Sequence, residues 1–374
     1  MKLEEARDWL RLAAVPGLGG ASQRLLLKAF GLPEAIFEAR PTALAAVVGE
    51  SLAQRIAGAE DDAALEAGLA WLAEPDNHLL TLADPEYPRS LLDTEDPPPL
   101  LYVKGRLELL GRPALAVVGS RNGTAQGERN ARAFAATLSQ AGLTIVSGLA
   151  LGIDAAAHRG GLEGIGTTVA VIGTGPDRIY PARNAELARQ IAAQGAIVSE
   201  FPVGTPALAG NFPRRNRIIA GLAQGCLVVE AAERSGSLIT ARLAAEAGRE
   251  VFAIPGSIHS PQSRGCHKLI KQGAKLVESA QDVLEELRLT IFSERSEPDN
   301  TPSPREGGGG GFSFDVANSG EDLLLSAIGH DSCTLDTLVQ RTGLTPDNLL
   351  AMLLPLELEG RLAQLPGGLY QRLA

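Results

Sequence analysis

Three arginines lie close together in a stretch whose composition suits anion binding. Arg214, Arg215 and Arg217 belong to segment 201–229, which contains no acidic residue. Guanidinium groups stay charged at neutral pH and fit phosphate oxygens with paired hydrogen bonds. On a helical wheel Arg215 falls toward the apolar side, so it must find an anion or an acid. Phe212 precedes the cluster, where an exposed ring can stack on a nucleobase. An amphipathic helix with solvated arginines and a packed phenylalanine would give the same pattern.

Glycine and serine follow four of the predicted strands and lead into helices, a construction that turns backbone amides toward an anion. One such loop is ordinary in α/β proteins, but four that converge with Arg121 and the arginine cluster indicate a phosphate site. A narrow groove with a stacking ring suits splayed bases, so we predict a groove for single-stranded nucleic acid. The predicted phosphate-loop residues are Gly119, Ser120, Ser147, Gly148, Gly173, Gly175, Ser235, Gly236 and Ser237.

Motifs for catalysis are absent from the sequence. It contains no G-x-G-x-x-G fingerprint, P-loop, G-x-S-x-G elbow or H-E-x-x-H pair. Asp154 and His158 stand four residues apart on one predicted helix, a spacing compatible with acid–base work. The interpretation that we favour is that this pair caps and orients its own helix and the preceding loop. The five histidines show no metal-ligand spacing, so we predict no catalytic residue, no metal and no cofactor.

The elements that position these residues alternate between short apolar runs and helical patterns. Continuous apolar runs of four to six residues are typical of strands buried on both faces. Helical patterns cover 125–141, 153–161 and 237–247, so residues 112–288 are predicted to form an α/β, Rossmann-like, doubly wound parallel sheet. The predicted strands are 114–118, 143–146, 168–172, 196–198, 226–229, 250–254 and 275–277.

Three further segments flank this predicted sheet. Residues 1–111 show short helices and a Gly-rich turn that suggest a helix-hairpin-helix of a SAM-like domain, followed by an extended lead-in. Residues 289–320 lose periodicity and contain five consecutive glycines, which predicts a flexible linker. Residues 321–374 show three helices and a strand pair, the pattern of a winged helix. Both end domains are acidic, so we favour protein contacts or an accessory role over DNA binding.

Charge is segregated along the chain. The net charge of −10 divides into −8 for residues 1–111, +5 for 112–288 and −7 for 289–374. The middle segment alone is therefore suited to a polyanion. The charged N-terminus and the absence of a long apolar run exclude a signal peptide and a membrane span. Three widely spaced cysteines (Cys226, Cys266 and Cys333) favour a reducing, cytoplasmic environment.

The sequence closely resembles the DNA-processing protein A family, also called DprA or Smf, from about residue 9 to residue 370. The motifs that carry the resemblance are AVVGSR (116–121), SGLALGIDAAAH (147–158), GTGPDRIYP (173–181), SEFP (199–202), NFPRRNRIIAGL (211–222), SGSLITA (235–241) and GCHKLI (265–270). So many ordered motifs are more specific than a shared fold.

The resemblance implies a non-enzymatic protein of natural transformation and DNA recombination. Such a protein protects incoming single-stranded DNA, loads the RecA recombinase onto it and acts as a homodimer. By motif, Arg121, Asn211, Phe212, Arg215 and Arg217 would line the strand's groove, and His267, Ile270 and Leu276 would lie at the dimer interface.

One feature departs from the family pattern, in which a basic residue often precedes N-F-P. Segment 206–210 has none, which removes one phosphate contact unless Arg214 or Arg183 replaces it. The alternative function is a Rossmann-like enzyme, such as a nucleoside-monophosphate glycosidase. Such an enzyme is expected to show a P-G-G-x-G-T-x-x-E-type motif, which the comparable segment 233–238 lacks.

Overall fold

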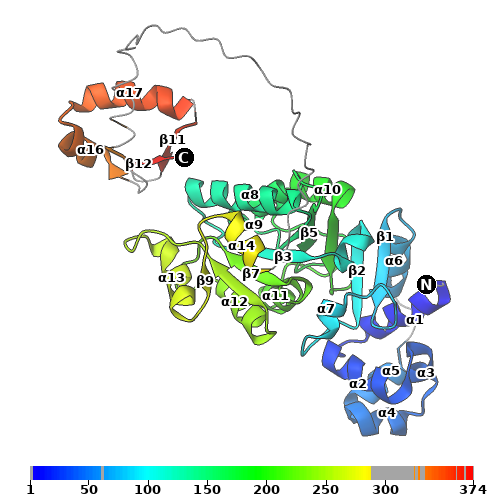
Figure 1. The fold of residues 1–374 in the computed structure, drawn as a ribbon. Coiled ribbons are helices and arrows are strands. Elements are labelled where there is room, and N and C mark those ends of the chain that lie inside the picture. The colour runs from blue at the N-terminus through cyan, green and yellow to red at the C-terminus, as the bar shows by residue number, and fades with distance from the viewer. Residues whose placement is uncertain are drawn as a thin grey trace, which may run out of the picture. The chain divides into compact units, whose positions relative to one another are not determined.

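A computed structural model describes residues 3–59, 63–287, 324, 327–328, 333–358, 360–365 and 368–373. The chain divides into two compact units, Met1–Ile291 and Phe292–Ala374 (Figure 1). Each unit has a hydrophobic core of its own.

The first unit begins with short helices that pack around a small core. They are α1 (Leu3–Ala14), α2 (Gly20–Phe30), α3 (Pro33–Glu38), α4 (Pro41–Val48), α5 (Glu50–Ala57) and α6 (Ala63–Leu72). Leu26, Ile36 and Leu44 are among the fully buried residues of this core. The turn between α1 and α2 contains Gly17 at φ +78°, a conformation that residues with a Cβ rarely adopt. A helix, a turn that contains glycine and a second helix are present, and their assignment to a SAM-like domain stays a prediction.

A large sheet forms the centre of the first unit (Figure 1). Its strand order is β1-β2-β6-β5-β4-β3-β7-β8-β9, and all neighbours from β6 to β9 are parallel. The strands are β1 (Asn77–Thr81), β2 (Leu100–Gly105), β3 (Ala114–Val118), β4 (Thr144–Ser147), β5 (Thr168–Val171), β6 (Ala196–Ser199), β7 (Gly225–Val228), β8 (Glu250–Ala253) and β9 (Lys275–Leu276). All seven predicted strands are present within one or two residues, and the Rossmann-like fold class is confirmed.

Two strands extend the sheet beyond the predicted set. β2 pairs antiparallel with β6, and β1 pairs antiparallel with β2. Both come from residues 1–111, which we assigned to the N-terminal helical domain. The lead-in that we predicted as extended therefore includes a strand of the central sheet.

Helices cover both faces of the sheet (Figure 1). Alternate residues of β3 point to opposite cores: Leu115 and Val117 pack with α8 (Ala125–Gln140), α9 (Ile153–Gly161) and α14 (Ala280–Glu286), whereas Ala116 and Val118 pack with the helices of the other face. The remaining helices are α7 (Arg89–Leu92), α10 (Ala185–Gln194), α11 (Asn211–Leu222), α12 (Ser237–Glu246) and α13 (Arg264–Lys271), with short 3-10 turns at Leu107–Gly111, Ala182–Asn184 and Pro261–Ser263.

The second unit has the elements of a winged helix. They are β10 (Cys333–Thr334), α16 (Leu335–Thr342), α17 (Pro346–Leu358), β11 (Leu362–Leu365) and β12 (Leu369–Arg372), and the sheet order is β10-β12-β11. Leu338, Leu349 and Leu356 lie in its core. Most of the first predicted helix, 322–328, and the whole predicted linker, 289–320, lie outside the described residues.

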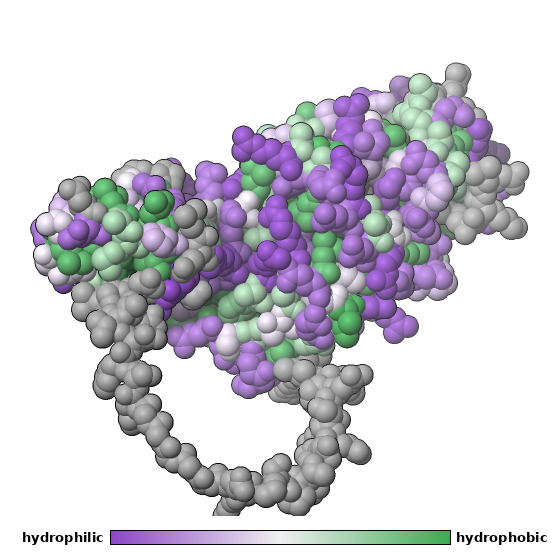
Figure 2. Space-filling view, turned by 90° about the horizontal axis from the view of Figure 1, so that it is seen from above, coloured by the Kyte–Doolittle hydropathy of each residue, from purple (hydrophilic) through white to green (hydrophobic). Residues whose placement is uncertain are grey.

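The described part of the chain contains no helix that could span a membrane. None of its helices has both the length and the apolar composition needed to cross a bilayer. The face shown in Figure 2 is mostly hydrophilic, with small scattered groups of apolar residues.

Candidate nucleic-acid interface

A crevice opens at the carboxyl ends of the central strands, where the direction of strand succession reverses. The chain runs from β3 through β4 and β5 to β6 on one side, then returns to place β7, β8 and β9 on the other. Ligands of doubly wound sheets bind at this switch point. The crevice has a volume of ≈ 750 Å³ and is lined by the loops after β3 and β7 and the first turn of α11.

The crevice is positively charged. Its described lining contains Arg121, Arg215 and Arg234, and the acid among these lining residues is Asp154, which is 6% exposed. Arg121 and Arg234 are exposed, and no carboxylate of the described residues lies within ion-pair distance of either guanidinium group. Among the described residues, these two guanidinium groups of the crevice therefore have no carboxylate partner.

Arg121 and two aromatic rings form a chain of contacts at the crevice. Its guanidinium carbon lies 5.6 Å from the centroid of the Phe212 ring, within cation–π range. The Tyr180 ring, from the loop after β5, lies 5.6 Å from the Phe212 ring at an interplanar angle of 46°. The loops after β3 and β5 and the start of α11 therefore join at one point.

Arg215 lines the crevice, but its guanidinium group is mostly committed to the protein. The residue is 5% exposed, and it donates to the carbonyl oxygens of Gly148 (2.5 Å) and Val171 and to Asn216 Oδ1 (3.0 Å). Burial lowers the pKa of Arg215 to about 10, while Asp154 opposes this shift, so the group remains charged at neutral pH. It thus ties the ends of β4 and β5 to α11 and adds positive charge.

The loop after β4 is shaped around Arg215. A Cβ at Gly148 would lie 2.3 Å from the Arg215 guanidinium group, so glycine is required there by close approach rather than by phosphate binding. Asp154 Oδ2 accepts hydrogen bonds from the backbone amides of Gly148 (3.1 Å) and Ala150 (3.4 Å). Burial raises the pKa of Asp154, and the charge of Arg215 opposes it.

His158 completes this loop arrangement. Its Nε2 accepts from the Leu149 amide (3.2 Å), and its Nδ1 lies 2.7 Å from Thr168 Oγ1, which itself donates to the Ile145 carbonyl. Nδ1 therefore carries the proton and donates. Burial lowers the pKa of His158 to about 3, so the imidazole is neutral at physiological pH. Asp154 and His158 orient the preceding loop, as the sequence interpretation proposed. The expected capping of their own helix is wrong, because the N-cap of α9 has no side-chain hydrogen bond.

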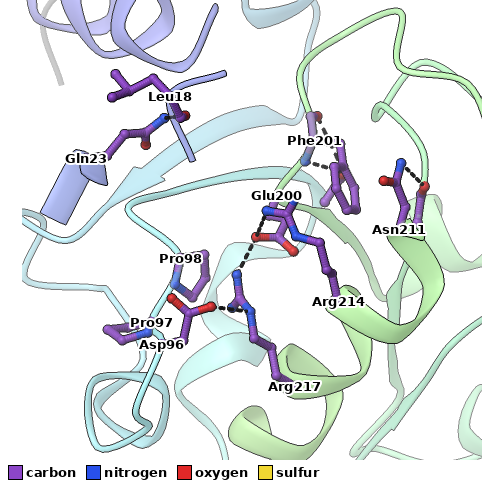
Figure 3. A network of polar contacts seen from close by, with 12 residues as sticks. Leu18, Gln23, Asp96, Pro97, Pro98, Glu200, Phe201, Asn211, Arg214 and Arg217 are labelled. Atoms are coloured by element: carbon purple, nitrogen blue, oxygen red, sulfur yellow. Dashed lines mark hydrogen bonds and ion pairs between the residues drawn. The ribbon is translucent and has the colours of Figure 1, made fainter. Parts of the chain in front are cut away.

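Arg217 does not face the crevice. Its side chain is 16% exposed and bridges two carboxylates, with Nε 3.0 Å from Asp96 Oδ2 and an amino group hydrogen-bonded to Glu200 (Figure 3). Asp96 also pairs with Arg24 of α2. This contact network, Arg24–Asp96–Arg217–Glu200, joins the N-terminal helices to α11.

Arg214 lies on the same side of α11 as Arg217. It is 56% exposed, its amino group lies 3.7 Å from Glu200 Oε2, and its guanidinium carbon lies 5.4 Å from the Phe201 ring centroid. The expectation that all three arginines line one groove therefore does not match their positions. Asp96 and Glu200, both outside the acid-free segment, attract two of them to the opposite side of the helix.

The predicted loop residues also separate into two groups. Gly119, Ser120, Ser235, Gly236 and Ser237 line the crevice. The remaining predicted residues have structural contacts: Asn211 Nδ2 donates to the Gly173 carbonyl, Ser147 Oγ donates to the Val117 carbonyl, Gly173 adjoins the Phe212 ring, and Gly175 packs against Asp177 and Pro202.

Helix α11 includes the aromatic residue that precedes the arginine cluster. It starts at Asn211, so Phe212 lies in its first turn rather than before it, and Pro213 is its third residue. Sequence reasoning did not assign Tyr180 or Arg234 to the site, although Tyr180 lies within the quoted motif GTGPDRIYP and Arg234 directly precedes SGSLITA. Neither the hydrophobic periodicity nor the charge count of the sequence identifies these two residues as part of the site, because their positions depend on how the loops after β5 and β7 fold.

The predicted dimer residues lie on or beside α13 and the edge strand β9. His267 Nε2 is 2.9 Å from the Gly256 carbonyl, Ile270 packs against the core, and Leu276 is 45% exposed. β9 is the last strand in the sheet order. Their role at an interface stays a prediction.

Comparison with known proteins identifies relatives over most of the chain. Residues 78–288 match the family described as DNA recombination-mediator protein A, and residues 315–368 match the DprA winged helix domain. Protein Smf of Escherichia coli is 47% identical over 311 residues, which cover 83% of this chain and 81% of that protein. Protein Smf of Synechocystis is 38% identical over 397 residues, the full length of both chains.

Solved structures agree with these matches. DNA processing protein A (DprA) of Streptococcus pneumoniae aligns with a TM-score of 0.67 and 41% identity, covering 76% of this chain and 97% of that one. DNA processing protein A of Helicobacter pylori, studied for its single-stranded DNA binding mode, aligns with a TM-score of 0.52 and 30% identity. That alignment covers 56% of this chain and 96% of that one.

Proposed function

Because the chain belongs to the DNA processing protein A (DprA/Smf) family, we propose that it binds single-stranded DNA in the crevice at the β3/β7 switch point. In this role it protects incoming DNA during natural transformation and takes part in recombination. The relative from Helicobacter pylori, with its single-stranded DNA binding mode, supports the choice of ligand.

The observation that carries this proposal is Arg121. It is an exposed cation with no acid partner among the described residues, and it lies over Phe212 beside the glycine and serine loops. Backbone phosphates account for much of the affinity in nucleic-acid binding, and aromatic rings add stacking that tolerates any base. Arg234, on the opposite wall, supplies a second phosphate contact.

The salt dependence of oligo-dT binding tests this proposal. Each neutralised phosphate contributes about 0.7 to the slope of log affinity against log salt concentration for a single strand. Arg121→Ala is expected to weaken binding and reduce the slope by about 0.7. The matched control is Arg112→Ala, an exposed arginine that precedes β3 and so lies at the opposite edge of the sheet. Equal slopes in wild type and Arg121→Ala would show that the strand binds elsewhere.

We further propose that the protein forms a homodimer and loads RecA. The family supports both roles, and the exposed Leu276 on edge strand β9 suits an interface between two copies. Leu276→Arg is expected to convert dimer to monomer in sedimentation velocity. Loading is measured as the onset of RecA ATPase on a strand precoated with single-strand-binding protein. If adding the protein does not shorten the lag before the RecA ATPase begins, the result would argue against loading.

We propose that the protein acts by binding, without turnover. Asp154 and His158, the pair most compatible with acid–base chemistry, are buried and hydrogen-bonded to the loop after β4. Incubation with nucleoside monophosphates and oligonucleotides, followed by chromatography, should return both unchanged. Release of a free base would favour the glycosidase alternative.

A further inference from the structure

Tyr180 is distinct among the aromatic residues of the described chain. Its side chain is 52% exposed, whereas every other described Phe, Trp or Tyr is buried or half-buried. It lies in the loop after β5, at the carboxyl edge of the sheet, and lines the charged crevice. Single exposed apolar residues are common on protein surfaces. An exposed ring beside Arg121 at the ligand edge calls for a more specific explanation.

Phe212, the ring that sequence reasoning chose for stacking, is already in contact with protein groups. The Arg121 guanidinium lies over it, and Tyr180 packs against it at 5.6 Å. On a third side, a Cβ at Gly173 would lie 3.0 Å from the ring. A base that stacks on Phe212 must displace one of these neighbours. A base that stacks on Tyr180 meets a ring that is already half-exposed.

We propose that Tyr180 is the side chain on which a base of the bound strand stacks, and that Phe212 supports it. This inference rests on the proposed single-strand binding in the same crevice. The Phe212 ring limits the movement of Tyr180, and a restrained aromatic loses less conformational freedom on binding. Arg121, whose guanidinium carbon lies 5.6 Å from the centroid of the same Phe212 ring, is placed to hold a phosphate next to the stacked base.

The arrangement separates two contributions to affinity. Arg121 acts on the phosphate backbone, so its effect depends on salt concentration. Tyr180 acts on a base through stacking, so its effect does not depend on salt and requires that a base be present. The hydroxyl of Tyr180 forms no hydrogen bond with any described residue. Phenylalanine should therefore replace it without loss.

The experiment compares binding of oligo-dT with that of an abasic strand of equal length. Tyr180→Ala is expected to raise the Kd for oligo-dT about 5- to 150-fold, with an unchanged salt slope. The Kd for the abasic strand should not change, and Tyr180→Phe should match wild type. The control is Ile165→Ala, which removes a 70% exposed apolar side chain from the loop before β5, at the opposite edge of the sheet.

A second measurement does not depend on comparing affinities. In Tyr180→Trp, the new indole is exposed, whereas Trp9 and Trp71 are 5% and 6% exposed. Stacking is expected to quench the fluorescence of this indole when oligo-dT is added and to leave it unchanged when the abasic strand is added.

The outcomes distinguish the inference from the function on which it rests. If wild type binds neither strand, the proposed function fails and the inference fails with it. If wild type binds oligo-dT with a slope that depends on Arg121, but Tyr180→Ala binds equally well, the function stands and the role of Tyr180 is refuted. Equal losses for both strands would also refute stacking.

Discussion

Arg217 provides the sharpest test of the structure, because its position reverses what the sequence suggests. If Arg217 were a phosphate contact, Arg217→Ala would reduce the salt slope of DNA binding and leave the free energy of unfolding unchanged. In the structure, Arg217 neutralises Glu200, whose side chain is 6% exposed. Removal of one partner of a buried ion pair leaves an uncompensated charge, which costs about 3–5 kcal/mol.

The loss of stability in Arg217→Ala should fall near the lower end of that range. Arg214 remains 3.7 Å from Glu200 Oε2 and supplies part of the missing charge. We expect the free energy of unfolding to fall by about 3 kcal/mol, which corresponds to about 1 M urea at an m-value of about 3 kcal/mol/M. Trp9 and Trp71, the two tryptophans of the chain, report this transition by fluorescence because both are buried in the first unit.

Two variants act as controls for this measurement. Arg214→Ala removes an exposed partner of the same carboxylate, and such pairs contribute about 1 kcal/mol or less. The double variant Glu200→Met/Arg217→Met replaces the buried pair with apolar side chains and should recover most of the lost stability. Asp96, which is 46% exposed and paired with Arg24, stays compensated in this variant.

The pH dependence follows from Glu200. Burial raises the pKa of this carboxyl, and Arg217 and Arg214 oppose the shift. Without Arg217, the folded variant binds a proton more tightly than the unfolded chain does, so part of the lost stability should return as the pH falls from 7 to 5. An Arg217→Ala variant as stable as wild type, with a salt slope reduced by about 0.7, would refute the network and restore Arg217 to the DNA groove.

Three further predictions address the crevice and its supporting loop. Gly236→Asp should fold normally, since a Cβ there meets nothing within 4 Å and the backbone angles of Gly236 (φ −62°, ψ −21°) suit any L-residue, yet it should weaken oligo-dT binding in a titration by placing a negative charge in the crevice. Gly148→Ala should lower the urea midpoint by about 1 M, because its Cβ would displace the buried Arg215; an unchanged midpoint would show that the loop relaxes freely. The neutral, buried His158 has a folded pKa below its unfolded value of 6.5, so wild type should lose stability as the pH falls from about 6.5 toward 3, and His158→Gln should lose less in the same acid denaturation series.

The sequence determined the sheet and its loops because their signals are local. Strands such as β3 and β4 come from short apolar runs, and the glycines and serines that follow them mark the turns into α8 and α9. A strand that is buried on both faces requires a continuous apolar run, so such a strand can be recognised in the sequence without knowledge of its contact partners. The position of the switch point, between β3 and β7, comes from the strand order of the structure.

Only the tertiary structure decided which polar side chains are free. Asp96 and Glu200 are distant from Arg217 in sequence, yet they neutralise it, and the pairing of β2 with β6 helps to bring those segments together. Arg121 keeps no acid partner among the described residues, because Glu230, a carboxylate that reaches the loop after β3, accepts hydrogen bonds from Thr124 instead. A charge count along the chain cannot separate these cases, since neutralisation depends on distances of a few ångströms that the fold sets.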